Sequence, residues 1–183
     1  MQLRTILAIA LVAGVFAACN GKNKIKEQTE NHDMATHEHV EEEKGAANPT
    51  FNNDKLNMVY QHYIHLKNAL VASEVNEAKN ASASLKTAIT ELNDKDATAV
   101  AEKLANSSTI EEQRAVLNDL SKNVERLIKS SGVKSGEVYL EFCPMANNND
   151  GGYWLSNEKE IKNPYFGDKM MKCGSVEETL VKK

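Results

Sequence analysis

Residues 108–132 read STIEEQRAVLNDLSKNVERLIKSSG, and this stretch carries the clearest helix signals in the chain. Ser108 followed by Glu111 three residues later matches a capping box, and Gly132 shortly after Lys129 is typical of a helix end. The apolar residues between these signals recur three or four positions apart. We therefore predict one long helix with a buried seam formed by Leu117, Leu120, Val124 and Leu127.

Three more segments with helical spacing precede this stretch, and no proline interrupts them between residues 53 and 131. The first starts near Asn53, the second covers Val75 to Leu92, and the third runs from about Asp96 to Asn106. Short loops between such segments favour an antiparallel bundle over residues 53–132. The apolar side of the first helix comprises Leu56, Val59, Tyr60, Tyr63, Leu70 and Val71, and that of the second comprises Val75, Ala78, Ser82, Leu85, Ile89 and Leu92.

Lys67 falls on the apolar side of the first segment, where a charged residue is unexpected. Two interpretations stay open: the side chain reaches past the seam to solvent, or it pairs with an acidic residue.

The pattern changes after Gly136, where Val138–Phe142 is rich in β-branched and aromatic residues and Asn149–Gly152 is a turn signal. We predict a strand, a turn and a second short strand within a lobe over residues 137–178. The predicted fold class is therefore mainly α: an antiparallel helical bundle of about four helices with a small C-terminal lobe, which contains Cys and Met residues and bears a short β-hairpin. Residues 53–183 are predicted to form a single domain.

The N-terminus resembles a bacterial lipoprotein signal. A basic start is followed by the apolar run Ile6–Phe16 and by Ala17-Ala18-Cys19. The run is too short to span a membrane, which needs roughly 20 residues. We predict a signal peptide over residues 1–18 and lipidation at Cys19, with an ordinary secretory signal as the alternative. Either signal implies export, and lipidation would anchor the protein to a bacterial membrane, facing the periplasm.

Residues 19–52 are polar and are predicted to form a disordered tether, because they contain too little apolar surface to offset the entropy of ordering. The tether contains His32, His37 and His39, a pattern that fits weak metal capture. A solvated, charged linker is an equally good interpretation.

Composition argues against nucleic acid as a partner: 22 basic residues face 26 acidic ones, and the net charge of −4 offers no basic patch. The sequence contains no phosphate loop, dinucleotide fingerprint, nucleophile elbow or HExxH motif.

The main candidate functional residues are sulfur-containing side chains in the predicted C-terminal lobe. The lobe holds Cys143, Met145, Met171 and Cys173, and thiolate and thioether ligands prefer Cu(I) or another soft metal ion. The competing interpretation is a structural disulfide between the two cysteines, because exported thiols meet an oxidising compartment. Both stay open. His62 and His65, three apart on the first helix, are candidate additional ligands or simply solvated side chains.

Four strings in the chain are similar to one known family: LKNALVAS at 66–73, VYLEFCPMA at 138–146, GGYWLS at 151–156 and IKNPYFGDKMMKCG at 161–174. They resemble domain-of-unknown-function family 3347, whose members are exported bacterial lipoproteins or C-terminal extensions of membrane-fusion subunits of heavy-metal efflux pumps. The resemblance implies metal handling in association with such a subunit and no enzyme activity. It places the family's cysteines and methionine at Cys143, Met145 and Cys173.

Overall fold

The structure is a computed structural model that describes residues 48–183. The predicted signal peptide, the lipidation site Cys19 and the tether histidines His32, His37 and His39 lie outside these residues. Among the described helices, none has the length and apolar content needed to cross a membrane.

Four long helices make up about half of the described chain: α1 (Asp54–Val71), α2 (Val75–Thr90), α3 (Lys95–Ala105) and α4 (Ile110–Ser131). Short polar side chains begin three of them, because Asn53, Asp94 and Thr109 each accept a hydrogen bond from a free N–H in the first turn. The prediction of a mainly helical protein with about four helices is confirmed.

The capping box of α4 lies one residue later than we predicted. Thr109, not Ser108, accepts from the backbone N–H of Glu112, and the Glu112 carboxylate accepts from the Thr109 N–H in return. The sequence Ser108-Thr109-Ile110-Glu111-Glu112 offers two overlapping Ser/Thr-x-x-Glu patterns, so the sequence alone did not distinguish them. The predicted seam is confirmed at Leu117, Leu120 and Val124, but its last buried residue is Ile128, because Leu127 is only partly buried.

Two small antiparallel sheets accompany the helices. The two-stranded sheet joins β1 (Thr50–Phe51) to β2 (Val133–Ser135). The three-stranded sheet has the order β4-β3-β5 and consists of β3 (Val138–Cys143), β4 (Gly152–Ser156) and β5 (Ser175–Leu180). The predicted hairpin is the β3–β4 pair. Strand β5 was not predicted, and it makes β3 the central strand.

Strand β1 lies inside the range that we assigned to the tether, residues 19–52. Phe51 is 1% exposed and its ring packs edge-on against Tyr60, with ring centroids 5.2 Å apart. The ordered domain therefore begins before residue 53. A two-residue strand with one apolar side chain is too short to produce a periodic pattern in the sequence.

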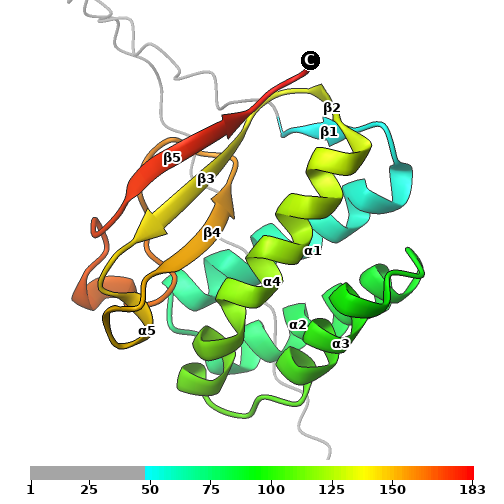
Figure 1. Ribbon diagram of the computed structural model, residues 1–183. Coiled ribbons are helices and arrows are strands. Elements are labelled where there is room, and N and C mark those ends of the chain that lie inside the picture. Colours follow the sequence, from blue (N-terminus) through cyan, green and yellow to red (C-terminus); the bar gives the residue numbers. More distant parts are fainter. Residues whose placement is uncertain (1–47) are drawn as a thin grey trace, which may run out of the picture. The chain divides into compact units, whose positions relative to one another are not determined.

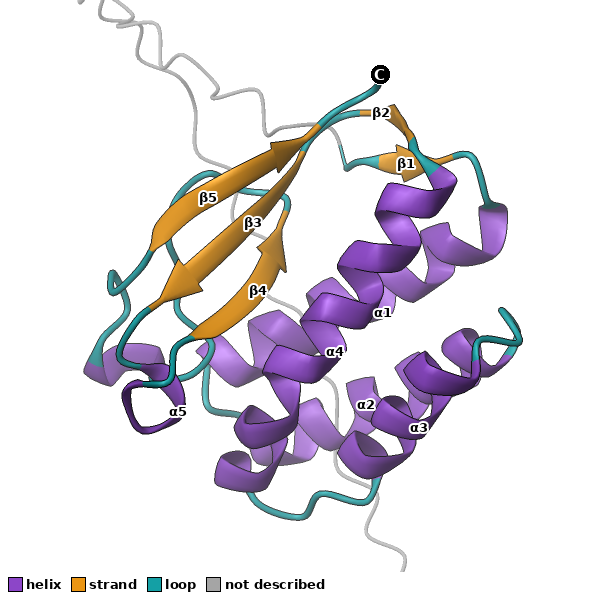
Figure 2. Ribbon diagram, viewed as in Figure 1, coloured by secondary structure: helices purple, strands orange, loops and turns teal. Residues whose placement is uncertain are grey.

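The elements form three successive groups, with the three-stranded sheet against α1 and α4, and with α2 and α3 on the other side of those two helices (Figure 1 and Figure 2). One continuous hydrophobic core runs through all of them, from Phe51 to Leu180. The C-terminal lobe thus shares its core with the helices.

The hydroxyl of Tyr63 joins three elements inside this core. It accepts a hydrogen bond from the backbone N–H of Leu155 in β4 at 2.9 Å and lies 2.7 Å from the Ser121 hydroxyl in α4. Because Ser121 itself donates to the Leu117 carbonyl, Tyr63 donates to Ser121. Asn118 of α4 accepts from the next outward N–H of β4, that of Tyr153. Side chains from α1 and α4 thereby accept the hydrogen bonds of two N–H groups, those of Tyr153 and Leu155, on the outer edge of β4.

Lys67 is 1% exposed, so it does not reach past the seam to solvent. Burial lowers its pKa, and the nearby carboxylates Glu158 and Glu141 act in the opposite direction. Glu141 of β3 is 0% exposed, and burial raises its pKa to about 8, against the opposing effects of Lys67 and of the Trp154 indole. The core of the lobe therefore holds a carboxyl group that is protonated over much of the neutral range.

Replacing Glu141 by Gln should flatten the dependence of stability on pH. The folded protein keeps the Glu141 proton up to about pH 8, whereas the ordinary pKa is 4.5, so this group makes the free energy of unfolding fall as pH rises between those values. Urea unfolding at several pH values from 5 to 8 measures the slope. Glu102→Gln, at an exposed position of α3, is the matched control. Equal slopes for Glu141→Gln and wild type would contradict the assignment.

Thr109→Ala should lower the free energy of unfolding by about 1 kcal/mol, because it removes the side-chain cap of α4. Ser108→Ala should change it by much less, since only the backbone N–H of Ser108 takes part in the box. Chemical denaturation of the two variants measures the difference. A larger loss for Ser108→Ala than for Thr109→Ala would place the cap at the position that the sequence first indicated.

Candidate sulfur site

The two cysteines of the described chain lie side by side at one end of the three-stranded sheet. Cys143 is the last residue of β3, and Cys173 comes two residues before β5 begins. The antiparallel register pairs Phe142 with Ser175, which brings the two cysteines to neighbouring positions. Their Sγ atoms are 2.6 Å apart. The structure thus brings together the two thiols that the sequence singled out.

Gly174 permits this close approach. Its φ of +143° is one that residues with a side chain rarely adopt, and a Cβ here would lie 2.8 Å from the Trp154 ring and 2.9 Å from the Phe142 carbonyl oxygen. The backbone next to Cys173 therefore lies directly against β3 and the indole of Trp154. A side chain at residue 174 would push the segment that carries Cys173 away from Cys143.

Asn163 holds the same segment from the other side. It is fully buried, and its amide donates to the carbonyl of Cys173 at 2.7 Å while its side-chain oxygen accepts from the N–H of Tyr165 at 2.8 Å. Its own N–H donates to the carbonyl of Met171 at 2.9 Å. Asn163 thus fixes the backbone on both sides of residue 172, and with it the position of the Cys173 thiol.

The thiols differ in their access to solvent. Cys143 is 0% exposed, whereas Cys173 is partly exposed. The contact with Cys143 raises the pKa of the Cys173 thiol, as do burial and the charge of a Cys143 thiolate, while the backbone N–H of Met145 has a smaller opposite effect. The Cys173 thiol therefore holds its proton more tightly than an ordinary cysteine thiol does.

The methionines lie in the two turns that flank the cysteines. Met145 follows Cys143 by two residues and is 47% exposed, which is high for a large apolar side chain. It lines a surface hollow together with Arg114, Lys169 and the turn Asn147–Asn149. All three asparagines of that turn have left-handed φ values, between 51° and 73°. Met171 occupies the turn before Cys173 and is partly buried.

The histidines of α1 do not join this site. His65 pairs with Glu77 of α2, with Nε2 and Oε1 2.6 Å apart, and His62 lines a separate hollow between α1 and α2. Over residues 48–183, no group of three or more His, Cys, Asp or Glu side chains gathers where it could hold a metal ion. The helix histidines are therefore not assembled with the cysteines.

Residues 59–136 match the model of a family described as Protein of unknown function (DUF3347). The family predicted from the sequence is confirmed over these residues. The DUF3347 match includes most of α1 and all of α2, α3 and α4, and it ends before the sulfur site. Comparisons with curated proteins and with solved structures found no match.

Sequence reasoning found the two cysteines but not the residues that position them. Asn163 and Gly174 lie within the string IKNPYFGDKMMKCG, which we noted as a resemblance without assigning either residue a role. The Asn163-Pro164 dipeptide is a turn signal, and it could have indicated a side chain that bonds to local backbone. The partners of Asn163, ten residues away at Cys173, depend on tertiary structure.

Asn163→Ala should lower the free energy of unfolding by about 2 kcal/mol, because it leaves the buried N–H of Tyr165 and the partly buried carbonyl of Cys173 without their side-chain partners. It should also slow formation of a Cys143–Cys173 disulfide, since Cys173 loses its fixed position. Chemical denaturation and thiol oxidation in a glutathione buffer measure the two effects. Asn68→Ala, at an exposed position of α1, is the control. Unchanged stability and oxidation in Asn163→Ala would contradict the anchoring role.

Proposed function

We propose that the protein is an exported, lipid-anchored and non-enzymatic binder of a soft metal ion, Cu(I), associated with heavy-metal efflux or homeostasis. Cys143 and Cys173 would supply two thiolates, with Met145 and Met171 as thioether ligands. The protein would buffer the ion or pass it to an efflux system through a membrane-fusion subunit. In this proposal the four helices form an antiparallel bundle that supports the sulfur site, and the tether links the domain to the membrane through Cys19.

The observation that carries the proposal is the pairing of the two thiols between two methionine-containing turns. Cu(I) prefers soft sulfur ligands and accepts low coordination numbers, so two thiolates and one or two thioethers suffice. The half-exposed Met145 and the partly exposed Cys173 would give an ion a path from solvent to the buried Cys143. A purely structural pair needs no such access.

The sulfur geometry requires a small adjustment for metal binding. With metal–sulfur bonds of about 2.3 Å, two thiolates on one ion lie roughly 3.7 to 4.6 Å apart, depending on the bond angle. The Sγ atoms would therefore have to separate by about 1 to 2 Å from their 2.6 Å distance. Side-chain rotation at Cys173, the more exposed of the two, could supply this movement.

The same 2.6 Å distance supports a second candidate function. In this alternative, Cys143 and Cys173 form a structural disulfide, and the protein is a non-enzymatic interaction module. A disulfide between them would close a loop of about 31 residues and stabilise the fold by about 3 to 4 kcal/mol in the chain-entropy model. The alternative gives no role to the exposure of Met145.

Metal stoichiometry tests the first proposal. Reduced protein should bind one equivalent of Cu(I) in competition with a Cu(I) chelator, and Cys143→Ser and Cys173→Ser should each weaken binding at least tenfold. Met145→Leu, which keeps the size of the side chain, should weaken it by less. Equal tight binding by wild type and both serine variants would end the metal proposal.

Thiol counting on freshly exported protein separates the two candidates. The metal proposal predicts two free thiols after metal removal, and it predicts that Cu(I) restores the thermal stability of reduced protein. The disulfide alternative predicts no free thiols and a loss of stability on reduction that metal does not reverse. Protein with no free thiols and no Cu(I) response would overturn the metal proposal in favour of the alternative.

A further inference from the structure

A hollow between α1 and α2 contains potential metal ligands of three kinds. Met58 and His62 line it from α1, and Glu91, just beyond the last residue of α2, lines it from the opposite side. The remaining lining residues are small or polar: Ser84, Thr87 and Ala88. Residues that carry a thioether, an imidazole and a carboxylate therefore line one solvent-accessible space. None of these residues belongs to the sulfur site.

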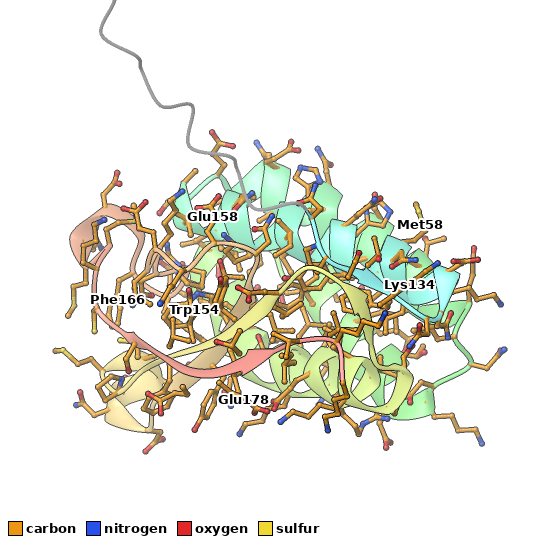
Figure 3. All side chains as sticks on the ribbon, turned by 90° about the horizontal axis from the view of Figure 1, so that it is seen from above. Met58, Lys134, Trp154, Glu158, Phe166 and Glu178 are labelled. Atoms are coloured by element: carbon orange, nitrogen blue, oxygen red, sulfur yellow. The ribbon has the colours of Figure 1, made fainter. Side chains whose placement is uncertain are left out.

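Met58 is the more unusual member, because half of its surface is exposed on a helix whose other large apolar residues are mostly buried. Figure 3 shows its side chain extending from the helix into solvent at the opposite side of the view from Phe166. Met58 precedes His62 by four residues, so the two side chains lie on the same face of α1, one turn apart. This spacing lets two ligands from one helix converge on a single ion.

His62 also differs from the other histidine of α1. The imidazole of His65 bonds to the Glu77 carboxylate at 2.6 Å, whereas none of the hydrogen bonds found in the described chain involves the imidazole of His62. His62 is partly buried and is one of the residues that line the hollow. A partly desolvated ring nitrogen without a protein partner is free to coordinate an ion.

We propose that Met58, His62 and Glu91 form a second, exposed site for Cu(I), separate from the cysteine pair. The thioether selects a soft monovalent ion, the neutral imidazole supplies the strongest bond, and the carboxylate offsets the positive charge. The site would be weaker than a thiolate site and would exchange ions quickly, because it is open to solvent. This inference does not depend on metal binding by Cys143 and Cys173.

The test uses the full chain with Cys143→Ser and Cys173→Ser, and with Gln in place of His32, His37 and His39. These changes, made together with Cys19→Ser, remove the thiols and the tether histidines as competing ligands. Ag(I), which has the ligand preference of Cu(I) and is not readily oxidised, is titrated while the methionine methyl groups and histidine rings are followed by NMR. We expect the Met58 methyl and the His62 ring to shift together and to saturate at one equivalent.

Met58→Leu and His62→Gln should each weaken this binding at least tenfold, and Glu91→Gln should weaken it less. His65→Gln is the matched control, since it removes an imidazole from the same helix but outside the hollow. An unmoved Met58 methyl, or equal affinity in Met58→Leu and the parent chain, would overturn the site. If the serine variants do not fold, the Met58 methyl of the wild-type chain gives the same answer. Failure of this test leaves the proposal of metal binding by the two cysteines intact. Failure of the cysteine tests likewise leaves the site at Met58, His62 and Glu91 intact.

Discussion

The arrangement of the described chain depends on the hydroxyl group of Tyr63. It connects α1 to the hydroxyl of Ser121 in α4 and to the backbone N–H of Leu155 in β4, and all three residues are buried. Burial of polar groups is costly unless each finds a partner, so these two hydrogen bonds fix how the sheet lies against the two helices. Once β4 is placed, β3 pairs with it, and Cys143 and Glu141 take their positions. The sulfur site therefore rests on a polar contact in the middle of an apolar core.

The helices were the predictable part of the fold, because each one carries its own signal in apolar spacing and capping residues. The predictions were wrong where two capping patterns overlap in the sequence, as at Ser108 and Thr109. They were incomplete where a strand forms only by pairing with a distant segment. Strand β5 is the clearest case. Its sequence SVEETL has one buried residue and little alternation of apolar and polar residues. It is a strand because it pairs with β3, and its composition alone does not predict one.

The candidate site was predictable in its chemistry and not in its geometry. Cysteine and methionine types indicate soft-ion or disulfide chemistry wherever they lie, so Cys143 and Cys173 could be identified from the sequence alone. Their contact, the anchor Asn163 and the close approach at Gly174 require the fold. The histidines of α1 show the opposite limit. Their helical spacing was predicted correctly, but the sequence did not reveal that His65 bonds to Glu77 or that His62 lines a hollow together with Met58.

The central position of β3 has a consequence for how copies of this protein behave when they are crowded. The outer edge of β4 is occupied by side chains of α1 and α4, whereas β5 is the other edge strand of the sheet. An open edge is a template for pairing with another chain. Strand β5 carries two exposed carboxylates: Glu178 pairs with Lys129 of α4 at 2.7 Å, whereas Glu177 has no basic partner among the ion pairs of the described chain, so two such edges brought together would place the Glu177 charges near each other. A charged residue on an edge strand disfavours pairing of one sheet with another.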